Sequence, residues 1–176
     1  MRALLPALKL FALASLALFA LPAFAQTAPA TPPMHLFMAG GDLKAAIAKL
    51  KAARVGDQPL VKEPRLLSLP PYRAQLEYRP GTAPANVHET DAEMVYVLEG
   101  AGFVVTGGKL VNESRTDATN LAGVSIAGGT SQVIAVGDVF LIPENTPHQF
   151  TPSATNPLVL ISVHMPRPAQ PGWSWP

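Results

Sequence analysis

Between residues 66 and 165, apolar and polar residues alternate with a period of two, in short runs separated by turn residues. The clearest run is 72–79, where Tyr, Ala, Leu and Tyr alternate with Arg, Gln, Glu and Arg. A period of two is that of a β-strand, whose successive side chains point to opposite faces. Many short strands joined by close turns favour an antiparallel sandwich or barrel over alternating strands and helices. The sequence therefore predicts an all-β domain over residues 66–165.

The polar side of the run 72–79 has two interpretations. Arg73, Gln75, Glu77 and Arg79 form either a solvent-exposed sheet face or the polar wall of a pocket. Antiparallel sheets commonly expose one face to water and bury the other. We therefore expect this polar side to be solvent-exposed.

A helical pattern precedes the strands, over residues 42–56. Asp42 can cap the helix, Leu43, Ile47 and Leu50 share one face, and Gly56 can end it. The pattern predicts one amphipathic helix packed on the outside of the main core. Residues 26–41 are expected to be a flexible leader, because their first part contains mainly Ala, Thr and Pro. Residues 166–176, with Trp173 and Trp175, are expected to form an irregular tail.

The first 25 residues have the pattern of a secretory signal peptide. Arg2 and Lys9 supply positive charge, residues 10–21 are apolar, and Ala23-Phe24-Ala25 is a small-x-small cleavage site. The apolar run is shorter than the roughly 20 residues that span a bilayer, although a retained anchor is the alternative interpretation. We therefore expect export, to the periplasm or the medium.

Composition excludes several classes of site and partner. The chain has no cysteine, so a disulfide framework, Cys-ligated zinc and thiol catalysis are excluded. After cleavage at residue 25, 11 basic residues face 12 acidic ones, a net charge of −1. Nucleic acids and anionic membranes attract clustered Lys and Arg. Neither is therefore an expected partner of the mature protein.

Two segments each place a histidine at the edge of a predicted strand. Residues 86–100 contain Asn86, His88 and Glu93, and residues 137–148 end in His148 after a proline turn. Imidazole and carboxylate at the mouth of a narrow barrel are groups that a divalent metal site needs. Whether the two segments converge is decided by the fold.

The two segments resemble the two motifs of the cupin family. Four residues separate His88 from Glu93 and six separate Glu93 from Gly100; in the second segment, five separate Gly137 from Pro143 and four separate Pro143 from His148. The resemblance implies a double-stranded β-helix, or jelly-roll barrel, preceded here by the helix. It also implies a homodimer, because cupins often pair.

The resemblance implies a metal site as well. His88, Glu93 and His148 fall on three of the four ligand positions of the family, and Asn86 stands where the family has its first histidine. Asn86 could add a weak amide-oxygen ligand or hydrogen-bond a bound water, or it could weaken the site. Asn145 stands where the family prefers Gly, and Pro152 where it prefers Asn.

Two histidines and one carboxylate form the ligand set associated with non-haem iron(II). The expected cofactor is a divalent ion, either iron, manganese, zinc, nickel or copper, and the expected ligand is a small organic molecule. Dioxygenase-type oxidation is the favoured reaction, with isomerase or lyase chemistry as an alternative. No general base is identifiable, so catalysis itself is a hypothesis. The competing hypothesis is a metal-free cupin that binds a sugar or a similar small ligand without catalysis.

Three further residues are weaker candidates. His164 alternates with Ser162 in the last predicted strand, and we expect it to be a hydrogen-bonded wall residue. Arg115 and Asn120 lie among the 36 residues between Gly100 and Gly137 and are conceivable substrate contacts. We expect both to belong to a solvated loop and do not place them in the site.

Overall fold

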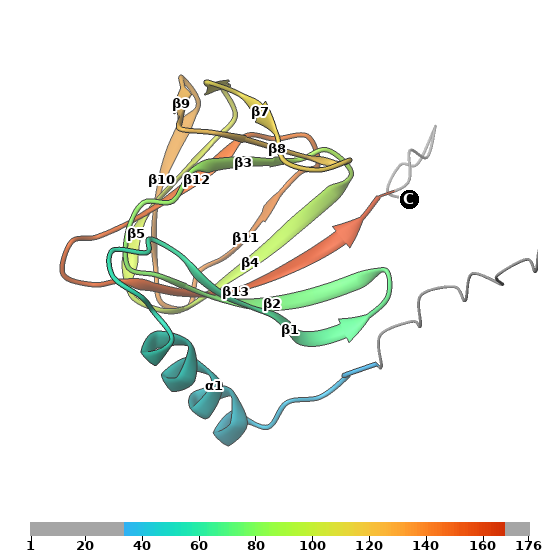
Figure 1. Ribbon diagram of the computed structural model, residues 1–176, viewed down its shortest axis with the longest axis vertical. Coiled ribbons are helices and arrows are strands. Elements are labelled where there is room, and N and C mark those ends of the chain that lie inside the picture. Colours follow the sequence, from blue (N-terminus) through green and yellow to red (C-terminus); the bar gives the residue numbers. More distant parts are fainter. Residues whose placement is uncertain (1–33, 168–176) are drawn as a thin grey trace, which may run out of the picture. The chain divides into compact units, whose positions relative to one another are not determined.

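The computed structural model describes residues 34–167 (Figure 1). The predicted signal peptide (1–25), residues 26–33 of the predicted leader and residues 168–176 of the predicted tail lie outside the described residues. The described elements are α1 (Gly40–Ala52), β1 (Val61–Leu69), β2 (Tyr72–Arg79), β3 (Ala85–His88), β4 (Asp91–Glu99), β5 (Ala101–Thr106), β6 (Lys109–Val111), β7 (Ser114–Arg115), β8 (Asn120–Gly123), β9 (Ser125–Ala127), β10 (Thr130–Ala135), β11 (Val139–Ile142), β12 (His148–Pro152) and β13 (Leu158–Pro166).

The strands form two large antiparallel sheets that face each other (Figure 1). One sheet has the order β1-β2-β13-β4-β11 and the other β10-β5-β12-β3-β8-β7, with β6 and β9 paired separately. An apolar core lies between them and draws on both, through Val95, Val97, Val104, Ile134, Ile142, Phe150, Leu158 and Leu160. The prediction of an all-β barrel with one helix is confirmed. Among the described residues, no helix is long and apolar enough to cross a membrane.

The helix and the segment before it differ from the expected bounds. The helix begins at Gly40 after Ala39, without a side-chain cap, so Asp42 lies inside its first turn. There a carboxylate is favourable because it opposes the positive end of the helix dipole. The helix ends at Ala52, before Gly56. Ahead of it, His35 exchanges two backbone hydrogen bonds with Ser68 of β1 (2.9 and 2.8 Å), so part of the expected leader is paired with the sheet.

The helix covers the outer face of the five-stranded sheet (Figure 1). Leu50 of α1 packs in one cluster with Leu76 of β2 and Val159 of β13. The apolar side of β2 therefore faces the helix, and its polar side faces the interior of the barrel. The expectation that this polar side is solvent-exposed is wrong: Glu77 is 1% exposed. An amphipathic helix needs an apolar surface to pack on, and here α1 packs on the apolar outer face of the five-stranded sheet.

Candidate metal centre

Three side chains converge inside the barrel: His88 at the end of β3, Glu93 in β4 and His148 at the start of β12. Their ligand atoms all lie within 4.8 Å of one another. Glu93 Oε2 is 3.2 Å from His148 Nε2 and 3.6 Å from His88 Nε2. Glu93 and His148 are buried and His88 is partly exposed. Two imidazoles and one carboxylate thus form a group that could hold a metal ion.

Short turns bring these residues together. Only two residues separate His88 from Asp91, the first residue of β4. Glu93 is the third residue of β4, so this short connection keeps it close to His88. The turn before His148 contains Asn145 with a φ of 56°. Asn145 N donates to the carbonyl oxygen of His88 at 2.7 Å, which ties the two motif segments to each other. Asn adopts this left-handed conformation more readily than other non-glycine residues, so it can replace the Gly that the family prefers there.

Glu93 has one oxygen satisfied and one without a hydrogen bond. Ser162 Oγ donates to Oε1, while Oε2 is buried and has no hydrogen-bond partner. Burial alone would raise the pKa of Glu93, but His148 and His164, when protonated, and the Ser162 hydroxyl outweigh burial and hold the pKa below its ordinary value. The ionised carboxylate is the form of Glu93 that binds a cation. A buried polar atom without a partner is uncommon, and a cation between Oε2 and the two imidazoles would supply one.

Both histidines are held with their Nε2 atoms toward Glu93. His148 Nδ1 lies 3.1 Å from the carbonyl oxygen of Thr146. His88 Nδ1 lies 2.5 Å from Oδ1 of Asn120. Both oxygens only accept hydrogen bonds, so each Nδ1 carries a proton and Nε2 is the ring nitrogen left to bind an ion. This is the arrangement of metal-binding histidines, whose second nitrogen donates to an oxygen.

Asn86 lies beside this group. It stands two residues before His88 on β3 and directly opposite His148 in the backbone register. Its Nδ2 donates to the carbonyl oxygen of Pro84 at 3.2 Å. Asn86 is thus next to the centre, and its role as a fourth ligand stays a prediction.

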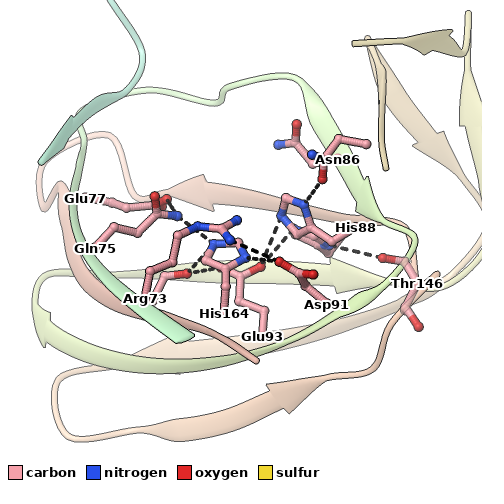
Figure 2. Close-up of polar contacts among 12 residues, drawn as sticks. Arg73, Gln75, Glu77, Asn86, His88, Asp91, Glu93, Thr146 and His164 are labelled. Carbon is pink, nitrogen blue, oxygen red and sulfur yellow. Dashed lines mark hydrogen bonds and ion pairs between the residues drawn. The ribbon is translucent and has the colours of Figure 1, made fainter. Parts of the chain in front are cut away.

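His164 lies next to the centre in β13 (Figure 2). Its ring meets that of His88 edge to face, with centroids 4.7 Å apart. Gln75 Nε2 donates to His164 Nε2 at 2.7 Å, and Ser162 Oγ lies 3.3 Å away, which confirms the expectation of a hydrogen-bonded wall residue. Burial lowers the pKa of His164 to about 4. The ring is therefore neutral near pH 7, with its proton on Nδ1, an atom that makes no hydrogen bond but lies 3.8 Å from Oδ2 of Asp91.

The inward side of β2 continues the polar wall. Glu77 accepts from Arg79 (2.6 and 2.7 Å) and from Gln75 (3.1 Å), and pairs with Lys62 at 3.0 Å. Burial alone would raise the pKa of Glu77, but Arg79 and Lys62 outweigh it and the pKa is lowered. The Arg79 guanidinium also lies 4.4 Å from the centre of the Phe150 ring. The sequence signal that could have predicted this inward orientation of the polar side chains was the predicted helix, because it needs an apolar sheet face to cover.

The pKa of His164 gives the folding stability a predictable pH dependence. The folded protein keeps His164 neutral down to about pH 4, whereas the unfolded chain protonates it near its ordinary value of 6.5. Between these values the unfolded chain binds more protons, so the free energy of unfolding falls as the pH falls. Denaturant titration measures the free energy of unfolding of the metal-free protein at pH 7 and 4.5. Between these pH values, we expect it to fall by about 2–3 kcal/mol less in His164→Gln than in the wild type. In the control variant His35→Gln, which changes an exposed histidine, the free energy of unfolding should fall as much as in the wild type. Equal losses in His164→Gln and wild type would contradict the assignment.

The loop that follows β7 reaches the centre through Asn120. Arg115 pairs with Glu89 outside the centre, with distances of 2.7 and 3.0 Å. Asn120, the first residue of β8, contacts His88 directly. Arg115 is exposed as expected, although it belongs to strand β7, whereas the expectation is wrong for Asn120, which is half-buried in β8. The pairing of β8 with β3 carries Asn120 to His88, and nothing local in the sequence signals it.

The fold and the convergent ligand group agree with a comparison to known families. A family model described as cupin matches residues 62–169, which is more than half of the chain. The chain belongs to the cupin family. No curated protein matches it.

The chain is also similar, at low identity, to several solved structures. The cupin domain of Cnp3 from Schizosaccharomyces pombe is 13% identical, with 66% of this chain and 71% of that chain covered and a TM-score of 0.47. The protein TT1209 from Thermus thermophilus is 22% identical, with 69% and 95% covered and a TM-score of 0.47. KdgF from Halomonas sp. is 18% identical, with 65% and 87% covered and a TM-score of 0.44.

Proposed function

We propose that this cupin binds one divalent metal ion through His88, Glu93 and His148 and acts on a small organic molecule. The observation that carries the proposal is Glu93 Oε2, a buried carboxylate oxygen without a hydrogen bond, placed between two imidazole Nε2 atoms. Hard and borderline divalent ions bind this combination of nitrogen and oxygen donors. The oxygens of Thr146 and Asn120 hold both rings in the form that binds.

The favoured reaction is oxidation of the small molecule by dioxygen, with isomerase or lyase chemistry as the alternative. An ion held by two imidazoles and a carboxylate keeps open positions at which a substrate is polarised or dioxygen is activated. The chain itself supplies a polar wall beside that position. The Nδ1–H of His164 is a buried donor that makes no hydrogen bond, with Oδ2 of Asp91 3.8 Å away, and an oxygen of a small ligand would supply a hydrogen bond.

We also propose that the protein is exported and forms a homodimer. Export is supported by the charged, apolar and small-x-small pattern of residues 1–25. Pairing is supported by the exposed apolar side chains of Val133 in β10 and of Val139 and Leu141 in β11, both of which are edge strands.

Elemental analysis tests the metal proposal. The protein is recovered from the periplasm without a metal-binding affinity tag, beside the double variant His88→Ala plus His148→Ala. We expect about one equivalent of a divalent ion in the wild type and almost none in the double variant, because two of three ligands are removed. His35→Ala, which removes an exposed histidine, should retain the wild-type content.

The metal found also separates the reactions. Iron or manganese would favour oxidation, and zinc would favour Lewis-acid chemistry. A wild type that holds no ion after reconstitution with iron, manganese, nickel, copper and zinc would contradict the proposal. A metal-free cupin that binds a small ligand without catalysis would then be the better account.

A further inference from the structure

The segment between β7 and β8 makes a contact that the ligand motifs do not include. Asn120 stands opposite His88 in the register of β8 against β3, so the two side chains lie on the same face of neighbouring strands. Asn120 Oδ1 accepts from His88 Nδ1. His88 therefore depends on a residue 32 positions further along the chain for the position of its proton.

The amide of Asn120 is itself oriented. Its Nδ2 donates to both carboxylate oxygens of Asp117, at 2.8 Å each. Asp117 also accepts from the backbone N–H of Thr119 at 2.9 Å, and these hydrogen bonds hold the pKa of Asp117 below its usual range. An ionised carboxylate only accepts, so the NH₂ group of Asn120 must face Asp117 and the oxygen must face His88.

The segment is fastened to the strand end that carries His88. Arg115 donates to both carboxylate oxygens of Glu89, the residue that follows His88, and to the carbonyl oxygens of Asp117 and Ala118 (3.4 and 3.2 Å). Glu89 N donates to the carbonyl oxygen of Thr119 at 2.9 Å. These contacts hold the Asp117–Asn120 pair at a constant place relative to the His88 ring.

We propose that Asn120, oriented by Asp117, is a positioning residue that holds His88 in the Nδ1–H form and thereby sets the metal affinity of the centre. The inference rests on the proposed function. The other histidine of the centre uses the backbone oxygen of Thr146, which no substitution removes. A substitution in this segment can therefore change the metal affinity through the side chain of Asn120.

The first measurement needs no metal. Long-range ¹H–¹⁵N correlation spectra of the metal-free protein report which ring nitrogen of a histidine carries the proton. We expect His88 to be in the Nδ1–H form in the wild type and to shift toward Nε2–H in Asn120→Ala. Asn156→Ala, which truncates an exposed asparagine between β12 and β13, should leave the His88 signals as in the wild type.

The second measurement is metal affinity, by competition of Zn²⁺ or Mn²⁺ with a chelator. Asn120→Ala should bind about 10–100-fold more weakly, the usual effect of losing such a partner. The exchanged pair Asp117→Asn plus Asn120→Asp keeps an oxygen toward His88 and a donor beside it. This double variant should recover both the Nδ1–H form of His88 and most of the metal affinity. If the substitutions acted only by distorting the loop, the double variant would recover neither.

The inference is overturned if Asn120→Ala keeps the wild-type tautomer of His88 and the wild-type metal affinity. It is also overturned if the exchanged pair behaves like Asn120→Ala while remaining folded by circular dichroism. If the wild type binds neither ion, the proposed function fails, and the tautomer spectra still decide whether Asn120 controls the form of His88.

Discussion

Replacing Glu93 with glutamine is expected to lower the affinity for a divalent ion by about 10²–10³-fold, the share of one ligand in a structural metal site. If both Nε2 atoms that face Glu93 carry lone pairs, the same substitution should leave the metal-free protein as stable as the wild type or more stable by about 1 kcal/mol. Glu93 Oε2 is a buried acceptor that faces two Nε2 lone pairs and has no donor. The NH₂ group of glutamine would donate to those lone pairs, while its oxygen still accepts from Ser162.

Chelator competition measures the affinity, and denaturant titration of the metal-free protein measures the free energy of unfolding. Glu99→Gln is the matched control, because Glu99 pairs with Lys51 at a partly exposed position. It should change neither quantity by much. A Glu93→Gln variant that loses several kcal/mol would show that the carboxylate is paired with an imidazolium instead of awaiting a metal ion.

Replacing Arg79 with alanine is expected to lower the free energy of unfolding by about 3–5 kcal/mol, the usual cost of removing one partner of a buried ion pair. Arg79 is 3% exposed and Glu77 is 1% exposed. Without Arg79, the Glu77 carboxylate keeps only Lys62 and Gln75 as partners and stays in the interior. The contact of the guanidinium with the Phe150 ring is also lost.

Two further variants serve as controls. The exposed Arg65→Ala should change the free energy of unfolding by less than about 0.5 kcal/mol. The double variant Glu77→Leu plus Arg79→Met removes both charges and fills a similar volume. It should recover most of the loss, because no unpaired charge remains buried. A loss below about 1 kcal/mol in Arg79→Ala, or a double variant less stable than Arg79→Ala, would contradict this account of the interior.

The alternation of residues 72–79 shows how much a strand pattern can predict. It correctly predicts a strand and assigns its residues to two faces, because successive side chains point to opposite sides. Which face turns inward depends on what covers the other one. Helix α1 packs on the apolar face, so the polar face lines the barrel, and the prediction of a solvated face fails.

The resemblance of the two motif segments to the cupin motifs implied His88, Glu93 and His148 as a candidate ligand group. A two-residue connection brings Glu93 close to His88, whereas His148 reaches them through the pairing of β12 with β3. The partners of these residues come from much further along the chain. Asn120 is 32 positions from His88, and Ser162 is 69 positions from Glu93.

The sequence by itself therefore determined the strand-rich architecture, the family resemblance and the ligand candidates, because periodicity and turn residues act over short distances. Only the tertiary structure decided that β2 presents its charges to the interior, that Asn120 belongs to the centre and that both histidines present Nε2. These properties follow from strand register and from the packing of α1, which bring together side chains far apart in the sequence. Hydrogen bonds between such side chains set protonation forms, and local sequence contains no record of them.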